Sequence, residues 1–182
     1  MSIIADPFSP ELREHAEAIG YVCINWSWLE FVVECVLSEF INMPADKPEA
    51  LIVTSIIDFG KKLEVIKAIG FIRKPSTRWF AEWEGLINHI DNSLRPERNR
   101  YVHDLWRKEP DRPNPSRTNS RIKIVTPKAR AERILQTFET VEVDIKEVRN
   151  LAAAIRDASI SMVRLLGRAQ LLHVLPPTRS GQ

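Results

Sequence analysis

The stretch Ile19–Phe40, IGYVCINWSWLEFVVECVLSEF, decides the fold because its apolar residues repeat with the period of an α-helix. One stripe follows alternating steps of three and four: Ile19, Val22, Trp26, Leu29, Val33, Val36 and Phe40. A second apolar line runs along another side of the same helix: Tyr21, Ile24, Trp28, Phe31 and Cys35. Apolar residues on nearly all sides predict a helix that is buried on more than one face, with a second subunit covering one of them.

The same periodicity predicts further helices through Leu51–Ile69, Trp79–Leu94 and Val148–Leu172. Ser76 or Thr77 would cap the second of these, and Asp144 with Glu147 would open the last as a capping box. We therefore expect an all-α fold.

A small β-hairpin is expected as an insertion in this fold. Alternating residues predict strands over 121–126 and 137–143, and the polar, proline-rich residues 108–120 predict a mobile loop before them. The chain would form one domain over residues 1–175, with the loop and hairpin inserted over 107–143. Residues 176–182 would be a disordered tail.

Composition limits the protein class. The 182 residues carry a net charge of only +2, which is too mild to mark the whole chain as a nucleic-acid binder. Cys23 and Cys35 would lie roughly 18 Å apart on one helix, too far for a disulfide, and no metal ligands cluster near them. His15, placed among glutamates, is expected to be solvated. With no secretory signal and no expected membrane span, we predict a cytoplasmic protein without cofactor or metal.

The segment Arg95–Trp106, RPERNRYVHDLW, concentrates charge in the middle of the chain. Pro96 should kink or end the preceding helix, because proline lacks an amide hydrogen and disfavours the helical state of Arg95. Arg98 would then lie in the first turn of a new helix, at the positive end of its dipole. A bound phosphate would relieve that conflict, held by free backbone amides and guanidinium groups.

A histidine on the same helix adds acid–base chemistry. Asn99 and His103 are four positions apart and share a face, which the long side chain of Arg98 can reach. A histidine transfers protons near neutral pH, and an arginine stabilises extra negative charge on phosphate. These groups suit metal-independent RNA cleavage, in which the ribose 2′-hydroxyl attacks its own phosphate.

The segment Arg98–His103, RNRYVH, resembles the motif of the HEPN superfamily, in which an arginine and a polar residue precede a histidine. The resemblance implies an antiparallel bundle of four to five helices, a two-fold homodimer that brings two motifs together, and a metal-independent endoribonuclease similar to toxins and phage-defence effectors. Expected partners are an RNA substrate and an antitoxin or other regulatory protein. In one branch of the family, the antitoxin modifies a tyrosine two residues after the histidine. That position is Leu105 here, so this pairing is not carried over.

Under this resemblance Arg98 and His103 are the catalytic residues, with Asn99 and Glu30 in support. Arg95, Arg100 and Arg107 would bind RNA, together with Arg112 and Arg117 of the loop. Glu30, beside the apolar stripe, would pair with an arginine of the motif or stand as a partly exposed acid.

Other interpretations stay open. In place of a catalytic role, Arg98 and His103 could form a pair at the surface or at a subunit contact. Asn99 could form a hydrogen bond with the backbone at the start of its helix. Arg168 and His173 repeat the spacing near a helix C-terminus, where positive groups suit the dipole. The alternative function is a catalytically inactive helical dimerisation module that binds a protein partner or a nucleotide.

Overall fold

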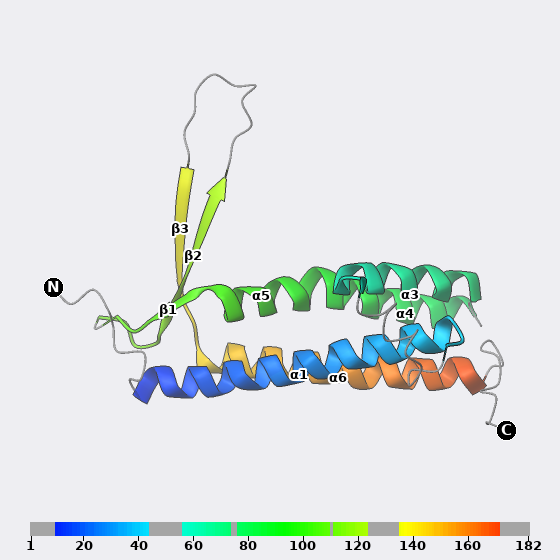
Figure 1. Ribbon diagram of the computed structural model, residues 1–182. Helices are drawn as coiled ribbons and strands as arrows, with labels where there is room; N and C mark the ends of the chain where they lie inside the picture. The colour runs from blue at the N-terminus through cyan, green and yellow to red at the C-terminus, as the bar shows by residue number, and fades with distance from the viewer. Residues whose placement is uncertain (1–9, 44–55, 74–75, 110, 124–134, 172–182) are drawn as a thin grey trace, which may run out of the picture. The chain divides into compact units, whose positions relative to one another are not determined.

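The protein is described by a computed structural model that covers residues 10–43, 56–73, 76–109, 111–123 and 135–171. Most of these residues are helical, and a small antiparallel sheet accompanies the helices (Figure 1). The elements in chain order are α1 (Pro10–Phe40), α3 (Phe59–Arg73), α4 (Thr77–His89), the π-helix η1 (Ile90–Leu94), α5 (Arg95–His103), β1 (Leu105–Arg107), β2 (Ser116–Lys123), β3 (Leu135–Glu142) and α6 (Ile145–Leu171). The predicted combination of a mainly helical chain with a small sheet is confirmed at this level.

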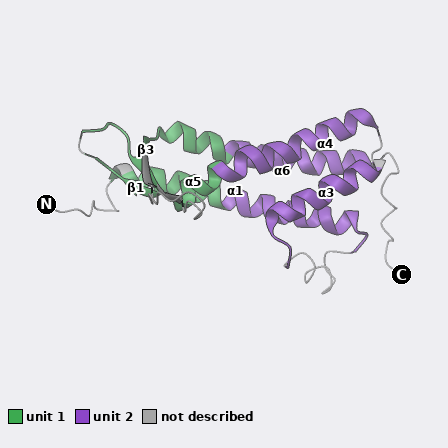
Figure 2. Cartoon of the chain, turned by 90° about the horizontal axis from the view of Figure 1, so that it is seen from above, with its two compact units in different colours: residues 1–23, 97–152 green, residues 24–96, 153–182 purple. Residues whose placement is uncertain are grey.

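The chain divides into two compact units, each made of two separate stretches (Figure 2). The first unit contains residues 1–23 and 97–152, and the second contains residues 24–96 and 153–182. Both α1 and α6 begin in the first unit and end in the second. The units are therefore not consecutive domains along the sequence.

The helices of the second unit do not all run antiparallel. Gln170 near the end of α6 donates a hydrogen bond to Glu39 near the end of α1, at 3.0 Å, so these two helices run in the same direction. Trp79 near the start of α4 donates from Nε1 to the carbonyl oxygen of Leu165 at 2.9 Å, so α4 runs opposite to α6. The expectation of an antiparallel bundle is therefore wrong for α1 and α6.

A tryptophan pair lies at the centre of the second unit. Trp83 is fully buried, stacks on Trp79 with ring centroids 5.2 Å apart, and donates from Nε1 to the carbonyl oxygen of Ile66 at 3.3 Å. Gly70 of α3 lies against this ring, because a Cβ atom built there would come within 2.6 Å of Trp83 Nε1. A glycine is thus needed at position 70 for α3 and α4 to pack this closely.

Two residues that were predicted at helix starts, Ser76 and Asp144, accept hydrogen bonds from the first amides of α4 and α6. Ser76 Oγ accepts a hydrogen bond from the amide of Trp79 at 3.1 Å, which caps α4. Asp144 Oδ1 accepts from the amide of Lys146 at 2.8 Å, directly before α6. Both side chains satisfy amides that have no partner within the helix.

The sheet has the order β1-β2-β3, and both pairs are antiparallel. It differs from the predicted hairpin because β2 begins at Ser116, within the residues expected to form a loop, and because β1 was not predicted. The register pairs Thr118 with Thr140, whose hydroxyls lie 3.0 Å apart. Polar cross-strand pairs of this kind stabilise the polar start of β2, which has no alternating apolar pattern. Residues 124–134, between the strands, lie outside the described residues.

His15 is buried in the first unit, and the expectation that it is solvated is wrong. Its Nε2 lies 3.1 Å from the carbonyl oxygen of Val143, and its ring centroid lies 5.7 Å from that of Trp106. Leu12 and Ala18, three residues to either side, are buried as well. The face of α1 that carries His15 therefore points inward, whereas the neighbouring glutamates at positions 14 and 17 lie on the exposed face.

The segment around Pro96 is continuous helix. η1 separates α4 from α5, and the amide of Arg95 donates to the carbonyl oxygen of Ile90, five residues earlier. This wider turn lets the chain pass Pro96, which has no amide hydrogen, without ending the helix. Because helical residues lead directly into α5, its start does not offer the free amides expected for a phosphate site.

By length and composition alone, Leu12–Phe40 is long and apolar enough to cross a membrane. Helices packed in the core of soluble proteins meet the same criterion, and the opposite faces of this helix are both apolar. The finding is consistent with a soluble protein, and the cytoplasmic location stays a prediction.

Candidate functional site

The predicted catalytic residues lie on α5 and belong to the first unit. Arg98 is partly buried, whereas Asn99 and His103 are exposed. Arg98 Nη1 donates a hydrogen bond to Asn99 Oδ1 at 3.0 Å, so the amide side chain restricts the guanidinium from the neighbouring position. The structure therefore places an arginine, its hydrogen-bond partner and an exposed imidazole on one nine-residue helix.

These residues lie toward the end of a helical segment, not at its start. Arg100 and His103 occupy the last turn of α5, and the amide of Asp104 closes this turn by donating to the carbonyl oxygen of Arg100 at 3.0 Å. The C-terminus is the negative end of the helix dipole, where positive side chains are favoured. The positive charge is therefore compatible with the helix on its own, and the expected electrostatic conflict is absent.

The face of α5 that carries Tyr101 is buried against the sheet. Trp106 of β1 stacks on Tyr101 with ring centroids 5.9 Å apart and donates from Nε1 to the carbonyl oxygen of Tyr101 at 2.9 Å. This bond satisfies one of the carbonyls that a helix end leaves without an internal partner. Burial raises the pKa of Tyr101 to about 12, and the carboxylates of Glu97 and Glu147 act in the same direction. Tyr101 is therefore a neutral phenol at neutral pH.

Arg117 and Asp104 form a buried ion pair behind the exposed histidine. Arg117 Nη1 lies 2.9 Å from Asp104 Oδ2, and the two side chains are only 9% and 7% exposed. The guanidinium of Arg117 also lies over the ring of Tyr101, 5.1 Å from its centroid. The prediction that Arg117 lines the RNA path is wrong, because its guanidinium is buried inside the first unit and forms an ion pair with Asp104.

Asp104 was not predicted from the sequence as a functional residue. Its only sequence signal is its position directly after His103, and an acid after a helix is normally solvated. Its buried partner, Arg117, comes from the first part of β2, which was expected to belong to a loop. The ion pair could therefore not be found without the register of the sheet.

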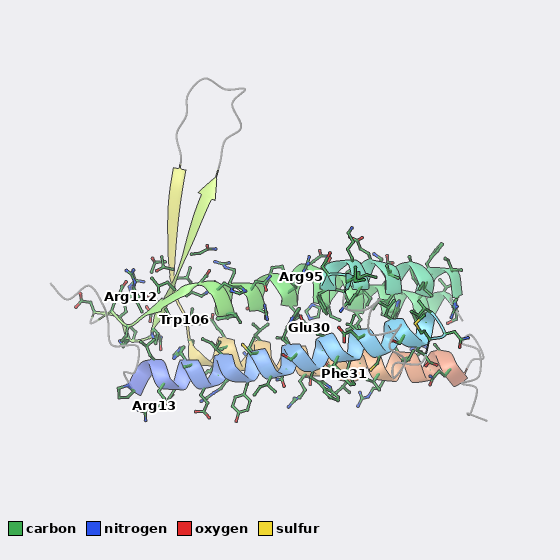
Figure 3. The ribbon with its side chains drawn as sticks, viewed as in Figure 1. Arg13, Glu30, Phe31, Arg95, Trp106 and Arg112 are labelled. Atoms are coloured by element: carbon green, nitrogen blue, oxygen red, sulfur yellow. The ribbon has the colours of Figure 1, made fainter. Side chains whose placement is uncertain are left out.

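The predicted RNA-binding arginines have different surroundings. Arg95 belongs to the second unit, where Nη2 pairs with Asp91 Oδ1 at 2.8 Å and the guanidinium packs against Gly60 (Figure 3). Arg100 is partly buried in α5, and Arg107 is exposed on β1. Arg112, from the segment after β1, pairs with Glu109 at 2.7 Å. Among these four, Arg107 presents the most exposed charge.

Glu30 lies in the second unit, on α1. Its Oε1 accepts a hydrogen bond from Trp26 Nε1 at 2.8 Å, one helical turn earlier. Part of its hydrogen-bonding capacity is therefore used within α1. The pairing of Glu30 with an arginine of the motif stays a prediction.

Metal ligands and thiols add little to this site. Within the described parts of the chain, no group of three or more histidine, cysteine, aspartate or glutamate residues is arranged to hold a metal ion. Cys23 and Cys35 are free thiols on α1. Burial raises the pKa of the Cys35 thiol, with Glu34 adding to the effect, so this thiol is a poor nucleophile at neutral pH.

The second copy of the motif spacing has a structural environment of its own. Arg168 of α6 pairs with Glu82 of α4, within the second unit, and His173 lies outside the described residues. The arginine that corresponds to Arg98 is thus engaged with a carboxylate.

Comparison with known proteins finds no matching family model, curated protein or solved structure. The proposed class of protein therefore depends on the residues of α5.

Proposed function

We propose that this protein is a metal-independent endoribonuclease of the HEPN type, and that two copies of the chain build one active site from Arg98 and His103 of each. The observation that carries the proposal is that one short helix bears an exposed imidazole, His103, and a guanidinium, Arg98, that is hydrogen-bonded to Asn99. An imidazole supplies proton transfer near neutral pH, and a guanidinium supplies the positive charge that a phosphoryl transition state requires.

The reaction needs two proton-transferring groups. The ribose 2′-oxygen forms a bond to phosphorus while the bond from phosphorus to the 5′-oxygen breaks. One His103 accepts the proton of the 2′-hydroxyl, and a second, protonated His103 gives its proton to the departing 5′-oxygen. The products are a 2′,3′-cyclic phosphate and a 5′-hydroxyl. Arg98 stabilises the additional negative charge on the phosphate oxygens during this step.

A single chain offers only one suitable histidine in the first unit. Of the two histidines described there, His15 is buried, with its Nε2 in hydrogen-bonding distance of the carbonyl oxygen of Val143, whereas His103 is exposed. A second chain would supply the second imidazole. This requirement links the proposed chemistry to the proposed homodimer.

The exposed apolar line of α1 supports a partner chain. Ile24, Trp28 and Phe31 are each more than half exposed, and the rings of Trp28 and Phe31 lie 5.4 Å apart. Figure 3 shows Phe31 on the side of α1 that points away from α3 and α4. Continuous exposed apolar patches mark interaction sites. We assign this line, including Tyr21 one turn earlier, to the contact between two copies of the chain.

Replacing Trp28 with glutamate should break the proposed dimer. A buried aromatic anchor contributes about 2 kcal/mol or more to an interface, so its replacement by a charge should raise the dissociation constant at least about 30-fold. Sedimentation of the purified protein over a range of concentrations measures this constant. The matched control is Ile72→Glu, which places the same charge at an exposed apolar position of α3 outside the line. Dimers that persist equally in both variants would rule out this interface.

The proposed activity is tested with purified protein and a labelled, structured RNA in the presence of EDTA. We expect cleavage to persist in EDTA, because no metal takes part. The products should end in a 2′,3′-cyclic phosphate and begin with a 5′-hydroxyl, because the 2′-hydroxyl is the nucleophile. RNA that stays intact at protein concentrations where the dimer is formed would refute the endoribonuclease proposal. Products with a 3′-hydroxyl would refute the mechanism, because they require attack by water or another nucleophile.

The proposal extends to the biological role of the protein. An RNase of this type acts as a toxin or phage-defence effector, and its activity is held in check by an antitoxin or another regulatory protein. A second candidate function is a catalytically inactive dimerisation module that binds a protein partner or nucleotide. The exposed line of α1 favours it independently of the motif. Stable dimers without RNA cleavage would support this second candidate.

A further inference from the structure

The last turn of α5 is attached to the sheet by several interactions at one place. The indole of Trp106 bonds the carbonyl oxygen of Tyr101, and the guanidinium of Arg117 lies over the ring of Tyr101. Asp104, the first residue after α5, pairs with Arg117. Each interaction joins the helix end to β1 or β2.

The sheet register explains how these groups meet. Trp106 of β1 lies opposite Arg117 of β2 in the antiparallel pair. The ladder continues into β3, where Arg117 lies opposite Val141. Strand pairing on both sides therefore fixes the backbone that carries Arg117. The guanidinium that pairs with Asp104 thus comes from a fixed position in the sheet.

The pair has the properties of an orienting contact. Both side chains are more than nine-tenths buried, and a buried charge pair is costly to disrupt because each partner would be left uncompensated. In some proteins such pairs specify one arrangement of the chain without adding stability. Asp104 is covalently adjacent to His103, so fixing Asp104 restricts the backbone on which the exposed imidazole stands.

We propose that Asp104 and Arg117 are positioning residues for His103, and that they anchor the catalytic end of α5 to the sheet without touching RNA. This inference rests on the proposed ribonuclease function. It assigns a role in the active site to the first part of β2, which was expected to belong to a loop. A side chain placed to within about half an ångström of its working position is a general requirement of efficient catalysis.

The test compares Asp104→Asn, which keeps the shape and removes the charge, with Asp104→Glu, which keeps the carboxylate. The control is Glu109→Gln, which removes a carboxylate from the exposed pair with Arg112. The first readout is the nuclear magnetic resonance signal of the His103 ring, measured without RNA. The second is the kcat and KM of RNA cleavage, corrected for the folded fraction.

We expect Asp104→Asn to broaden or split the His103 ring signal and to lower kcat about 10- to 100-fold, with KM within about two-fold of the wild type. Asp104→Glu should restore part of kcat, and Glu109→Gln should match the wild type. Unchanged ring signals and an unchanged kcat in Asp104→Asn would overturn the positioning role and leave the nuclease proposal intact. If the wild type does not cleave RNA, the nuclease proposal fails separately, and the ring signal still decides whether Asp104 orients His103.

Discussion

Replacing His103 with alanine should lower the rate of RNA cleavage by about 10²–10⁴-fold, which is the usual contribution of a positioned acid–base group. The effect should fall on kcat and leave RNA binding nearly unchanged, because the imidazole acts on protons in the transition state and phosphate contacts hold the substrate. His103 is exposed at the end of α5, so alanine there removes no buried contact. The variant should therefore unfold at the wild-type temperature.

The matched control for His103→Ala is His89→Ala, which removes an exposed histidine from α4. This control should cleave RNA at the wild-type rate. Arg98→Ala should lose activity to a degree similar to that of His103→Ala, because Arg98 would stabilise the transition-state charge. A purified His103→Ala protein that cleaves as fast as the wild type, in preparations free of contaminating nuclease, would remove the basis of the proposed chemistry.

Replacing Trp83 with alanine should lower the free energy of unfolding by about 3–5 kcal/mol, as expected for a fully buried aromatic side chain. The change removes the stack on Trp79 and the hydrogen bond to the carbonyl oxygen of Ile66. Gly70 stands against the same ring and cannot fill the space. Urea denaturation followed by circular dichroism measures the loss, which is large compared with the total stability of an ordinary domain.

Two further variants separate packing at Trp83 from a general effect of substitution. Ile72→Ala removes a side chain that is 78% exposed, so its cost should stay within about 0.5 kcal/mol. Gly70→Ala should cost about 1–3 kcal/mol by overpacking against Trp83, and less when combined with Trp83→Phe, which lacks the indole nitrogen that the new Cβ would meet. Equal costs for Trp83→Ala and Ile72→Ala would contradict the described core.

The helical part of the fold was largely predictable because it is encoded locally. The alternating spacing in α1 predicted its buried side, and Trp26, Leu29 and Val33 are all buried. The second line of the same helix was predicted to need a further partner, and Trp28 and Phe31 are exposed in the single chain. Helix caps were predictable for the same reason, since a cap depends on residues within one turn.

Features that depend on distant partners were not predictable. Pro96 indicated a break, but the chain accommodates it with a π-helical turn, which has no strong sequence signal. The polar start of β2 was expected to be a loop because its stability comes from cross-strand pairs with β3. The burial of His15 was not predicted because its neighbours in the sequence are glutamates, which indicate an exposed turn. The helical period that places His15 on the inner face of α1 gave the correct answer.

The candidate site was predictable only in its local part. The sequence predicted that Asn99 and His103 share one helix, and the hydrogen bond between Arg98 and Asn99 adds a contact that neighbouring positions allow. The buried pair of Asp104 and Arg117 required the register of the sheet, and the contribution of a second chain requires an interface that one sequence does not specify. The residues that share α5 could thus be predicted from the sequence, whereas the contacts that hold α5 against the sheet could not.

The most direct test of the central claim is the cleavage rate of a mixed dimer. One chain is wild type, the other carries both Arg98→Ala and His103→Ala, and two different affinity tags isolate the heterodimer. A shared site needs both imidazoles, so we predict a rate at least about 100-fold below that of an equally tagged wild-type dimer. Retention of about half the wild-type rate would show that each chain cleaves RNA by itself and would contradict the composite site.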